Sequence, residues 1–178
     1  MTTPSQQQGP GSHRELLFPD FPNEFASTRR LLERYPDGKG DWKPDPKSRS
    51  LGELASHVTD VVGLGAAVLE TDDLEATERP RSLQLDSARA LLDRFDENVA
   101  RVTQGMQRVR DDALAQSWTL RFHGHPVAAG LRRDMLRTLL MSHLVHHRAQ
   151  LAGYYRALGI PVPSIYGPSA DEQPSGPA

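Results

Sequence analysis

Apolar residues recur at helical spacing in four stretches of this chain, with polar segments rich in proline and glycine between them. Residues three or four apart share one face of a helix, so this spacing predicts amphipathic helices. The pattern predicts four helices, over about 22–35, 51–70, 87–109 and 131–158. Ser50 and Glu53 form a capping box at the start of the second, and Ser87 can cap the third. Four helices of this length favour an all-α four-helix bundle.

One stretch between the third and fourth helices breaks the helical pattern. In residues 113–129, Trp118, Leu120 and Phe122 alternate with polar residues, which is the period of a strand. We therefore expect a short extended element or hairpin before the last helix.

The length of 178 residues favours one domain with loose ends. We expect a disordered N-terminal tail over 1–14, a bundle over 15–168 and a flexible C-terminal tail over 169–178. No apolar run approaches the roughly 18–20 residues that span a bilayer, so we expect no membrane partner. The first residues also lack the layout of a secretion signal, which favours the cytoplasm.

The balance of charges and the absence of cysteine exclude several functional classes of protein. Lys and Arg number 21 and Asp and Glu 23, and this balance argues against a nucleic-acid binder, which usually carries a basic stripe. The chain has no cysteine, so it has no disulfide, no cysteine nucleophile and no thiolate metal site. Any thiol chemistry must use a thiol carried by a small molecule.

Three of the seven histidines, His143, His146 and His147, lie in one five-residue stretch inside the last predicted helix. His143 and His147 are one helical turn apart, so they share a face, which the apolar pattern directs toward the bundle core. Two imidazoles in this arrangement can bind one metal ion. Hydrogen bonds to carboxylates or water would also satisfy them, and for an isolated pair this is the commoner case. Gln150 lies near His143 on the same wheel, and Arg148 is expected to face solvent.

His57 is the candidate third ligand. It borders the apolar stripe of the second helix and could face the His143 and His147 pair, although the sequence does not place these helices side by side. A boundary histidine in contact with solvent is the alternative. His123 and His125 form a rival pair, but Gly124 and Pro126 beside them mark a turn, so we favour a loop there.

Motifs around these histidines resemble the DinB-like superfamily. The stretch Ser50–His57 is similar to its second-helix motif, and His143–Leu151 is similar to its fourth-helix motif, with Ala149 where the family usually has glycine. Trp42-Lys-Pro and the segment 161–168 also resemble that family, and the likeness covers about residues 20–172.

This resemblance implies a four-helix bundle with a long crossover between helices two and three. It also implies a metal site of three histidines, matched here by His57, His143 and His147, with zinc or nickel as the ion. Relatives include thiol S-transferases that use bacillithiol or mycothiol, and many resemble homodimers.

We therefore expect a metal-dependent enzyme that transfers a low-molecular-weight thiol to an electrophilic small molecule. Three histidines and a vacant position are typical of a catalytic metal site. A metal-water hydrolase and a non-catalytic metal-binding or stress-response bundle are the alternatives, because fold kinship does not establish function. No catalytic residue is identified, although His146 or Gln150 could position a substrate.

Overall fold

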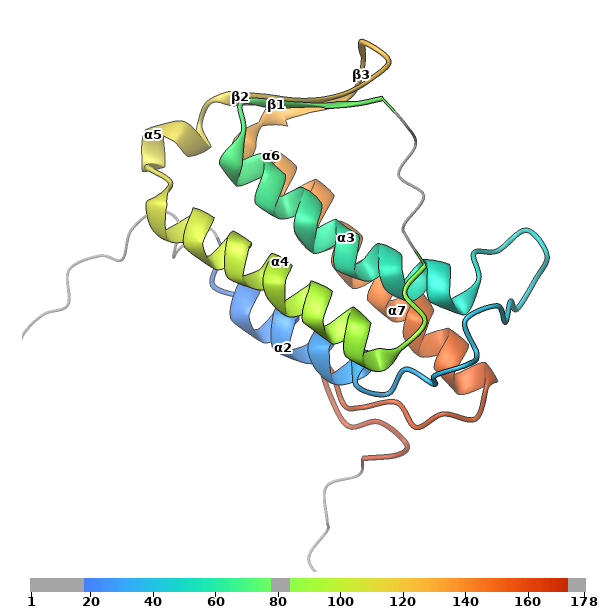
Figure 1. Ribbon diagram of the computed structural model, residues 1–178. Helices are drawn as coiled ribbons and strands as arrows, with labels where there is room; N and C mark the ends of the chain where they lie inside the picture. Colours follow the sequence, from blue (N-terminus) through green and yellow to red (C-terminus); the bar gives the residue numbers. More distant parts are fainter. Residues whose placement is uncertain (1–17, 78–83, 173–178) are drawn as a thin grey trace, which may run out of the picture.

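Four long helical segments pack side by side in the computed structural model, which describes residues 18–77 and 84–172 (Figure 1). The elements are α2 Phe21–Leu32, α3 Leu51–Glu70, β1 Asp73–Ala76, α4 Ala88–Arg108, α5 Asp111–Leu114, β2 Ser117–Phe122, β3 His125–Leu131, α6 Arg132–Met135, the π-helix η1 Leu136–Ser142 and α7 His143–Ala157. The continuous run α6–η1–α7 is the fourth segment of the bundle. No described helix is long and apolar enough to cross a membrane.

Local capping signals mark the starts of α3 and α4. The Ser50 side chain accepts a hydrogen bond from the Glu53 amide, and the Glu53 carboxylate accepts one from the Ser50 amide at 2.7 Å. Ser87 caps α4 in the same way through the Ala90 amide. Both predicted caps are confirmed, and α3 has the bounds expected from the sequence.

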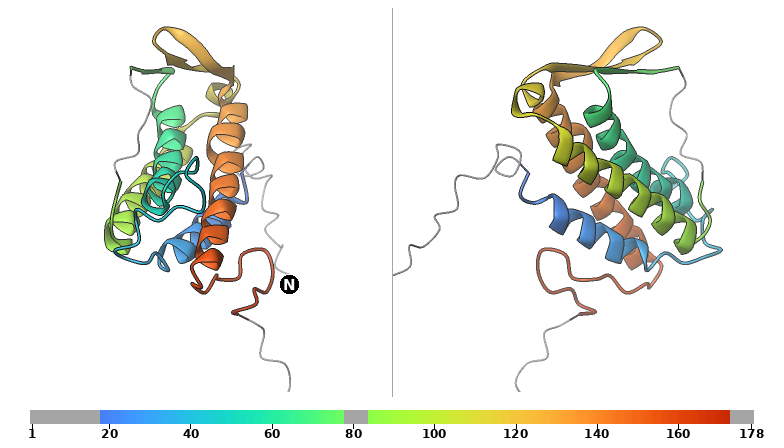
Figure 2. Two further views of the ribbon diagram at one scale, coloured as in Figure 1. Left: turned by 90° about the vertical axis from the view of Figure 1, so that its right-hand side faces the viewer. Right: turned by 60° about the vertical axis from the view of Figure 1, so that its left-hand side comes forward.

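A small sheet covers one end of the bundle, so the expected all-α class is too narrow (Figures 1 and 2). Strands β2 and β3 form the expected hairpin, with His123 and Gly124 at positive φ in its turn. β1 adds a third strand parallel to β2, which the sequence did not predict. β1 has four residues and is stabilised by pairing with a strand more than forty positions later in the sequence. The pattern of apolar residues around it therefore could not predict it.

The last helical run is not a uniform α-helix, since residues Leu136–Ser142 form a π-helix. A π-helix has more residues per turn, so it shifts the faces before and after it relative to one another. The face of α7 that enters the core is made of Leu144, Arg148, Leu151 and Tyr155. His143 and His147 lie half-buried on the adjoining face toward α3, so the expectation that they point into the core is met only in part.

Close packing of α3 against this run depends on Gly65. A Cβ atom at that position would lie 2.6 Å from Cδ2 of Leu140. Near the other end of this helix pair, the ring of Trp42 packs edge-on against Tyr154 of α7, with centroids 5.4 Å apart. These contacts hold α3, α7 and the connector before α3 together.

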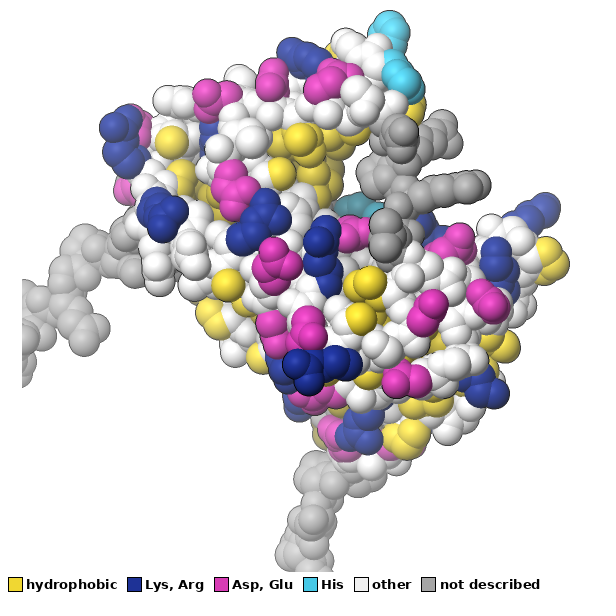
Figure 3. Space-filling model, in the orientation of Figure 1, with side chains coloured by type: hydrophobic (Ala, Val, Ile, Leu, Met, Phe, Trp, Pro, Cys, Tyr) yellow, Lys and Arg dark blue, Asp and Glu magenta, His cyan; other side chains and the backbone are white. Residues whose placement is uncertain are grey.

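The segment after α7 returns along the bundle beside α2 (Figures 1 and 2). Arg156 pairs with Asp171 at 2.7 Å and Arg34 pairs with Glu172 at 3.1 Å, so the last described residues are attached to the helices. The expected N-terminal tail over 1–14 lies outside the described residues. Positive and negative side chains are interspersed over the face shown in Figure 3.

Candidate metal centre

Three imidazoles from two helices, α3 and α7, meet between these helices. Nε2 of His57 lies 3.3 Å from Nε2 of His143 and 3.1 Å from Nε2 of His147. One ring nitrogen from each residue lies within 4.8 Å of the others, and all three side chains are half-buried. The structure thus brings together the three histidines singled out in the sequence.

The outer nitrogens of two of these rings have hydrogen-bond acceptors that fix their protonation. Nδ1 of His147 donates to Oε1 of Gln150 at 2.7 Å, and the His143 ring donates to the backbone carbonyl of Leu139. A neutral imidazole carries only one N–H. The inner Nε2 atoms of His143 and His147 therefore carry no hydrogen, and each presents a lone pair. Gln150 therefore orients His147.

The inner nitrogens cannot all be satisfied by one another. A hydrogen on Nε2 of His57 can be donated to only one of the two facing lone pairs, so one acceptor remains unpaired. Nδ1 of His57 is also buried without a hydrogen-bond partner among the described residues. Unsatisfied buried polar atoms cost free energy, and a cation at the centre would accept all three inner lone pairs.

The distances fit one small ion. Two nitrogens bound to a tetrahedral zinc ion at about 2.0–2.1 Å lie about 3.3 Å apart. The two distances from His57 Nε2, 3.3 and 3.1 Å, match that spacing. The residues present could therefore hold a divalent cation without a large rearrangement.

Burial keeps these imidazoles neutral at pH 7. Desolvation lowers the pKa of His57 to about 3 and the pKa of His147 to about 4, and it also lowers the pKa of His143. The positive charge of Arg49 lowers all three pKa values further. An unprotonated imidazole is the form that binds metal, so little proton competition is expected at neutral pH.

The remaining described histidines do not join this cluster. His123 lies in the hairpin turn, as expected for a loop, and His125 begins β3. The ring of His146 contacts that of His147, but it lines a separate cavity of about 390 Å³ with Asp20 and Arg137. His13 is outside the described residues.

Arg148, expected to face solvent, is instead buried, with 2% of its side chain exposed. It forms an ion pair with Glu24 at 2.6 Å and donates a second hydrogen bond, also at 2.6 Å, to the hydroxyl of Tyr166. Tyr166 in turn donates to the Glu24 carboxylate. A helical wheel assigns an arginine to the solvent side because it is polar. The partners that allow its burial, Glu24 and Tyr166, lie more than a hundred residues before it and eighteen after it, so the wheel could not include them.

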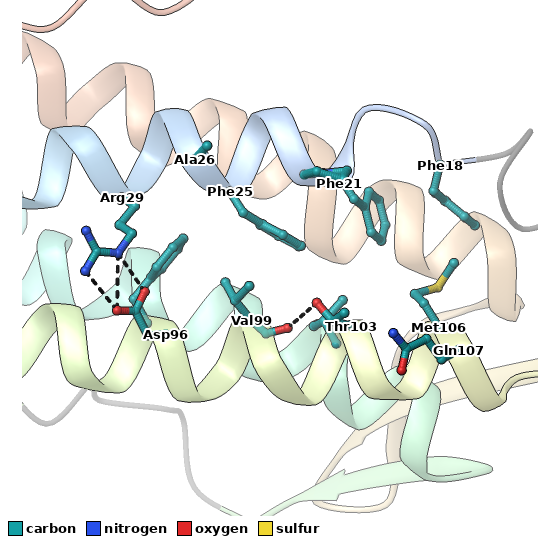
Figure 4. Close-up of a pocket in the computed structure, with 13 residues that line it drawn as sticks. Phe18, Phe21, Phe25, Ala26, Arg29, Asp96, Val99, Thr103, Met106 and Gln107 are labelled. Atoms are coloured by element: carbon teal, nitrogen blue, oxygen red, sulfur yellow. Dashed lines mark hydrogen bonds and ion pairs between the residues drawn. The ribbon is translucent and has the colours of Figure 1, made fainter.

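A second cavity of about 530 Å³ lies between α2 and α4, and no imidazole of the cluster lines it (Figure 4). Phe18, Phe21 and Phe25 point from α2 and the residues before it toward α4. Arg29 and Asp96 close one end with an ion pair at 3.0 Å. Its lining contains no histidine, and its one carboxylate, Asp96, is paired with Arg29.

Comparison with known proteins places this arrangement in a family. The model of the DinB superfamily matches residues 23–151. The uncharacterised protein YrdA of Bacillus subtilis strain 168 is 25% identical over 150 residues, which are 84% of this chain and 85% of that protein.

Solved structures have the same fold. A DinB-like protein of Bacillus cereus ATCC 10987 is 23% identical with a TM-score of 0.65, and covers 85% of this chain and 97% of its own. The DinB-like protein YjoA of Bacillus subtilis is 19% identical with a TM-score of 0.63, covering 85% and 99%. A putative DinB family member of Exiguobacterium sibiricum 255-15 is 19% identical with a TM-score of 0.60, covering 85% and 95%. Because the family model spans most of the bundle, including His57, His143 and His147, this chain belongs to the DinB superfamily.

Proposed function

We propose that His57, His143 and His147 hold one divalent metal ion, zinc or nickel, at which a small-molecule thiol is transferred to an electrophile. The observation that carries the proposal is the convergence of three Nε2 atoms with too few protons to satisfy one another. A metal bound there supplies a Lewis acid that lowers the pKa of a ligand S–H or O–H group.

The chain's own residues perform binding and orientation. The imidazoles stay neutral, Gln150 and the Leu139 carbonyl hold two of the rings by their outer N–H groups, and the three side chains are half-buried. Such outer hydrogen bonds raise the basicity of a ligating imidazole. Because the three side chains are only half-buried, we infer that a cosubstrate can reach them.

The absence of cysteine supports a thiol brought by the cosubstrate. In the transfer, the cosubstrate sulfur forms a bond to an electrophilic carbon. The leaving group departs with its electron pair and the thiol proton passes to water. The resemblance to the DinB-like superfamily, whose members include thiol S-transferases, adds to this proposal. It also implies a homodimer, which light scattering would test.

Metal analysis tests the site. Protein purified without a histidine tag should carry about one zinc or nickel ion per chain, and His57→Ala, His143→Ala and His147→Ala should each lose it. His123→Ala is the control, because that ring lies in the hairpin turn. Unchanged metal content in the three variants would refute the site.

A substrate panel tests the reaction. Metal-loaded protein is incubated with several small thiols and a chlorinated aromatic acceptor, and thioether product is measured. Thiol-dependent product that disappears in His147→Ala supports transfer. Hydrolysis of the acceptor without thiol would favour the metal-water hydrolase. A bound metal with neither activity would favour a non-catalytic bundle.

A further inference from the structure

A third cavity lies at the end of the bundle that carries the sheet, where α3 and α4 both finish (Figure 1). Its volume is about 540 Å³, and no residue of the histidine cluster lines it. Glu70, which does line it, lies thirteen residues after His57 on α3, or about 20 Å along the helix axis. The cavity is therefore separate from the candidate metal centre.

Arginine side chains dominate the charged lining of this cavity. Four arginines and two carboxylates line it: Arg101, Arg108, Arg110, Arg132, Glu70 and Asp72. Arg101 is paired with Glu70 through hydrogen bonds of 3.1 and 2.6 Å. Arg110 is paired with Asp112, at the start of α5. Arg108, exposed in the last turn of α4, has no ion pair with a described residue.

Arg132 is a buried cation without a buried counter-charge. Its side chain is 5% exposed, whereas that of its carboxylate partner, Asp72, is 99% exposed. Nη1 donates to the carbonyls of Val68 and Thr71, and Nε is buried with no hydrogen-bond partner among the described residues. A carboxylate in full contact with water is screened, so it offsets little of the cost of burying a guanidinium.

Arg148, which is also buried, shows how the chain compensates such a charge elsewhere. It pairs at 2.6 Å with Glu24, whose side chain is only 11% exposed. Arg132 has no such acid, and it borders the cavity instead. Capping of the last carbonyls of α3 accounts for Nη1 of Arg132, but it does not provide a negative charge. An anion in the cavity would provide one.

Size and charge together indicate the class of ligand. The volume lies within the range of about 300–1,000 Å³ that is typical of small-molecule sites, so an inorganic ion would fill little of it. The apolar side chains of Leu69, Val109 and Ala113 share the lining and suit a short organic body. Arg108 and Arg132 add two positive charges that no buried acid offsets, and guanidinium groups bind phosphate oxygens in pairs.

We propose that this cavity binds a small phosphate monoester, with the phosphate held by Arg108 and Arg132 and the organic part packed on Leu69, Val109 and Ala113. A phosphate monoester carries close to two negative charges at neutral pH, which matches the two arginines. This assignment is independent of the proposed function, because it uses no residue of the metal centre.

Isothermal titration calorimetry with phenyl phosphate at pH 8 and low salt tests the site, because the phosphate is then a dianion. Phenyl sulfate has the same shape with one charge, and inorganic phosphate has the charge without the ring. The native chain should bind phenyl phosphate about fivefold more tightly than either. Equal binding of the three probes, or no binding of phenyl phosphate, would overturn the proposal.

Arg108→Gln should weaken phenyl phosphate binding about tenfold, since it removes a charged donor to the phosphate. Arg89→Gln is the matched control, because Arg89 lies on the same helix, is 85% exposed and does not line the cavity. This control should bind phenyl phosphate as the native chain does. Unchanged binding in Arg108→Gln, or an equal loss in both variants, would contradict a phosphate site at Arg108.

Arg132 requires a readout that a purely structural role would not move, because its replacement also removes the cap of α3. In the native chain, the Nε–H resonance of its guanidinium, assigned by heteronuclear NMR, should shift as phenyl phosphate is added. The shift should saturate at the concentrations found by calorimetry. An unmoved resonance would mean that Arg132 only caps α3, and the proposal would fail.

Phosphate also binds metal ions, so the titration is repeated with metal-free His147→Ala. Its affinity for phenyl phosphate should equal that of the native chain, because the cavity is remote from the imidazoles. Loss of binding in this variant would place the phosphate at the metal centre and overturn the proposal. A native chain that holds no metal, yet binds phenyl phosphate through Arg108, would refute the proposed function and support this site.

Discussion

Replacing Arg148 by methionine should destabilise the protein strongly. The side chains of Arg148 and Glu24 are 2% and 11% exposed, and their charged atoms lie 2.6 Å apart. Removal of the arginine leaves the Glu24 carboxylate buried, with the Tyr166 hydroxyl as its one remaining side-chain donor among the described residues. Breaking a buried ion pair on one side costs about 3–5 kcal/mol, so we expect a loss of that size in the free energy of unfolding.

Urea unfolding followed by circular dichroism measures this loss. Two further variants test whether the loss of stability comes from an unpaired buried charge. Arg34→Met breaks an ion pair to Glu172 whose side chains are 44% and 37% exposed, and it should cost less than about 1 kcal/mol. The double variant Arg148→Met with Glu24→Leu removes both charges and should recover most of the stability lost by Arg148→Met alone.

Two outcomes would refute this reasoning. A loss below about 1 kcal/mol in Arg148→Met would mean that the pair is effectively solvated. A double variant as unstable as the single one would mean that the loss comes from packing and not from a stranded charge. Because Arg148 follows His147, we also expect weaker metal retention in the single variant.

Three further predictions concern the metal site and the packing around it. With the pKa of His57 lowered to about 3 and that of His147 to about 4, from 6.5, the unfolded chain binds more protons than the folded chain in this range. The urea midpoint of metal-free protein should therefore fall as the pH drops from 7 toward 4.5; a midpoint that rises would contradict the shifts. Gly65→Ala should cost about 1–3 kcal/mol in thermal unfolding, because the new Cβ would lie 2.6 Å from a leucine methyl of η1, whereas Gly153→Ala, with no atom within 4 Å, should be neutral or stabilising. Equal effects at the two glycines would disprove the packing argument. Ser50→Ala should cost about 1 kcal/mol through loss of the α3 cap, measured by urea unfolding, and Ser50→Asp should restore most of it.

Helix limits could be predicted from the sequence because they depend on neighbours along the chain. The capping box of Ser50 and Glu53 and the cap at Ser87 act within three residues, and both were found where expected. The shared face of His143 and His147 is likewise local, since both lie in one regular stretch of α7. Such features follow from backbone geometry alone.

Features that depend on distant partners could not be predicted in the same way. β1 exists only through pairing with β2, and the burial of Arg148 depends on Glu24 and Tyr166. The π-helix before His143 rotates the helix faces, so the histidines lie beside the core face of α7 and not at its centre, where the wheel placed them.

The sequence by itself determined the helices, the lack of cysteine and the stacking of two imidazoles on one face. Only the tertiary structure decided that His57 meets that pair, across 86 and 90 residues of chain. Family resemblance anticipated this meeting, but periodicity did not. The physical reason is that a helix presents its own side chains by a local rule, whereas the position of a second helix beside it depends on the packing of the whole core.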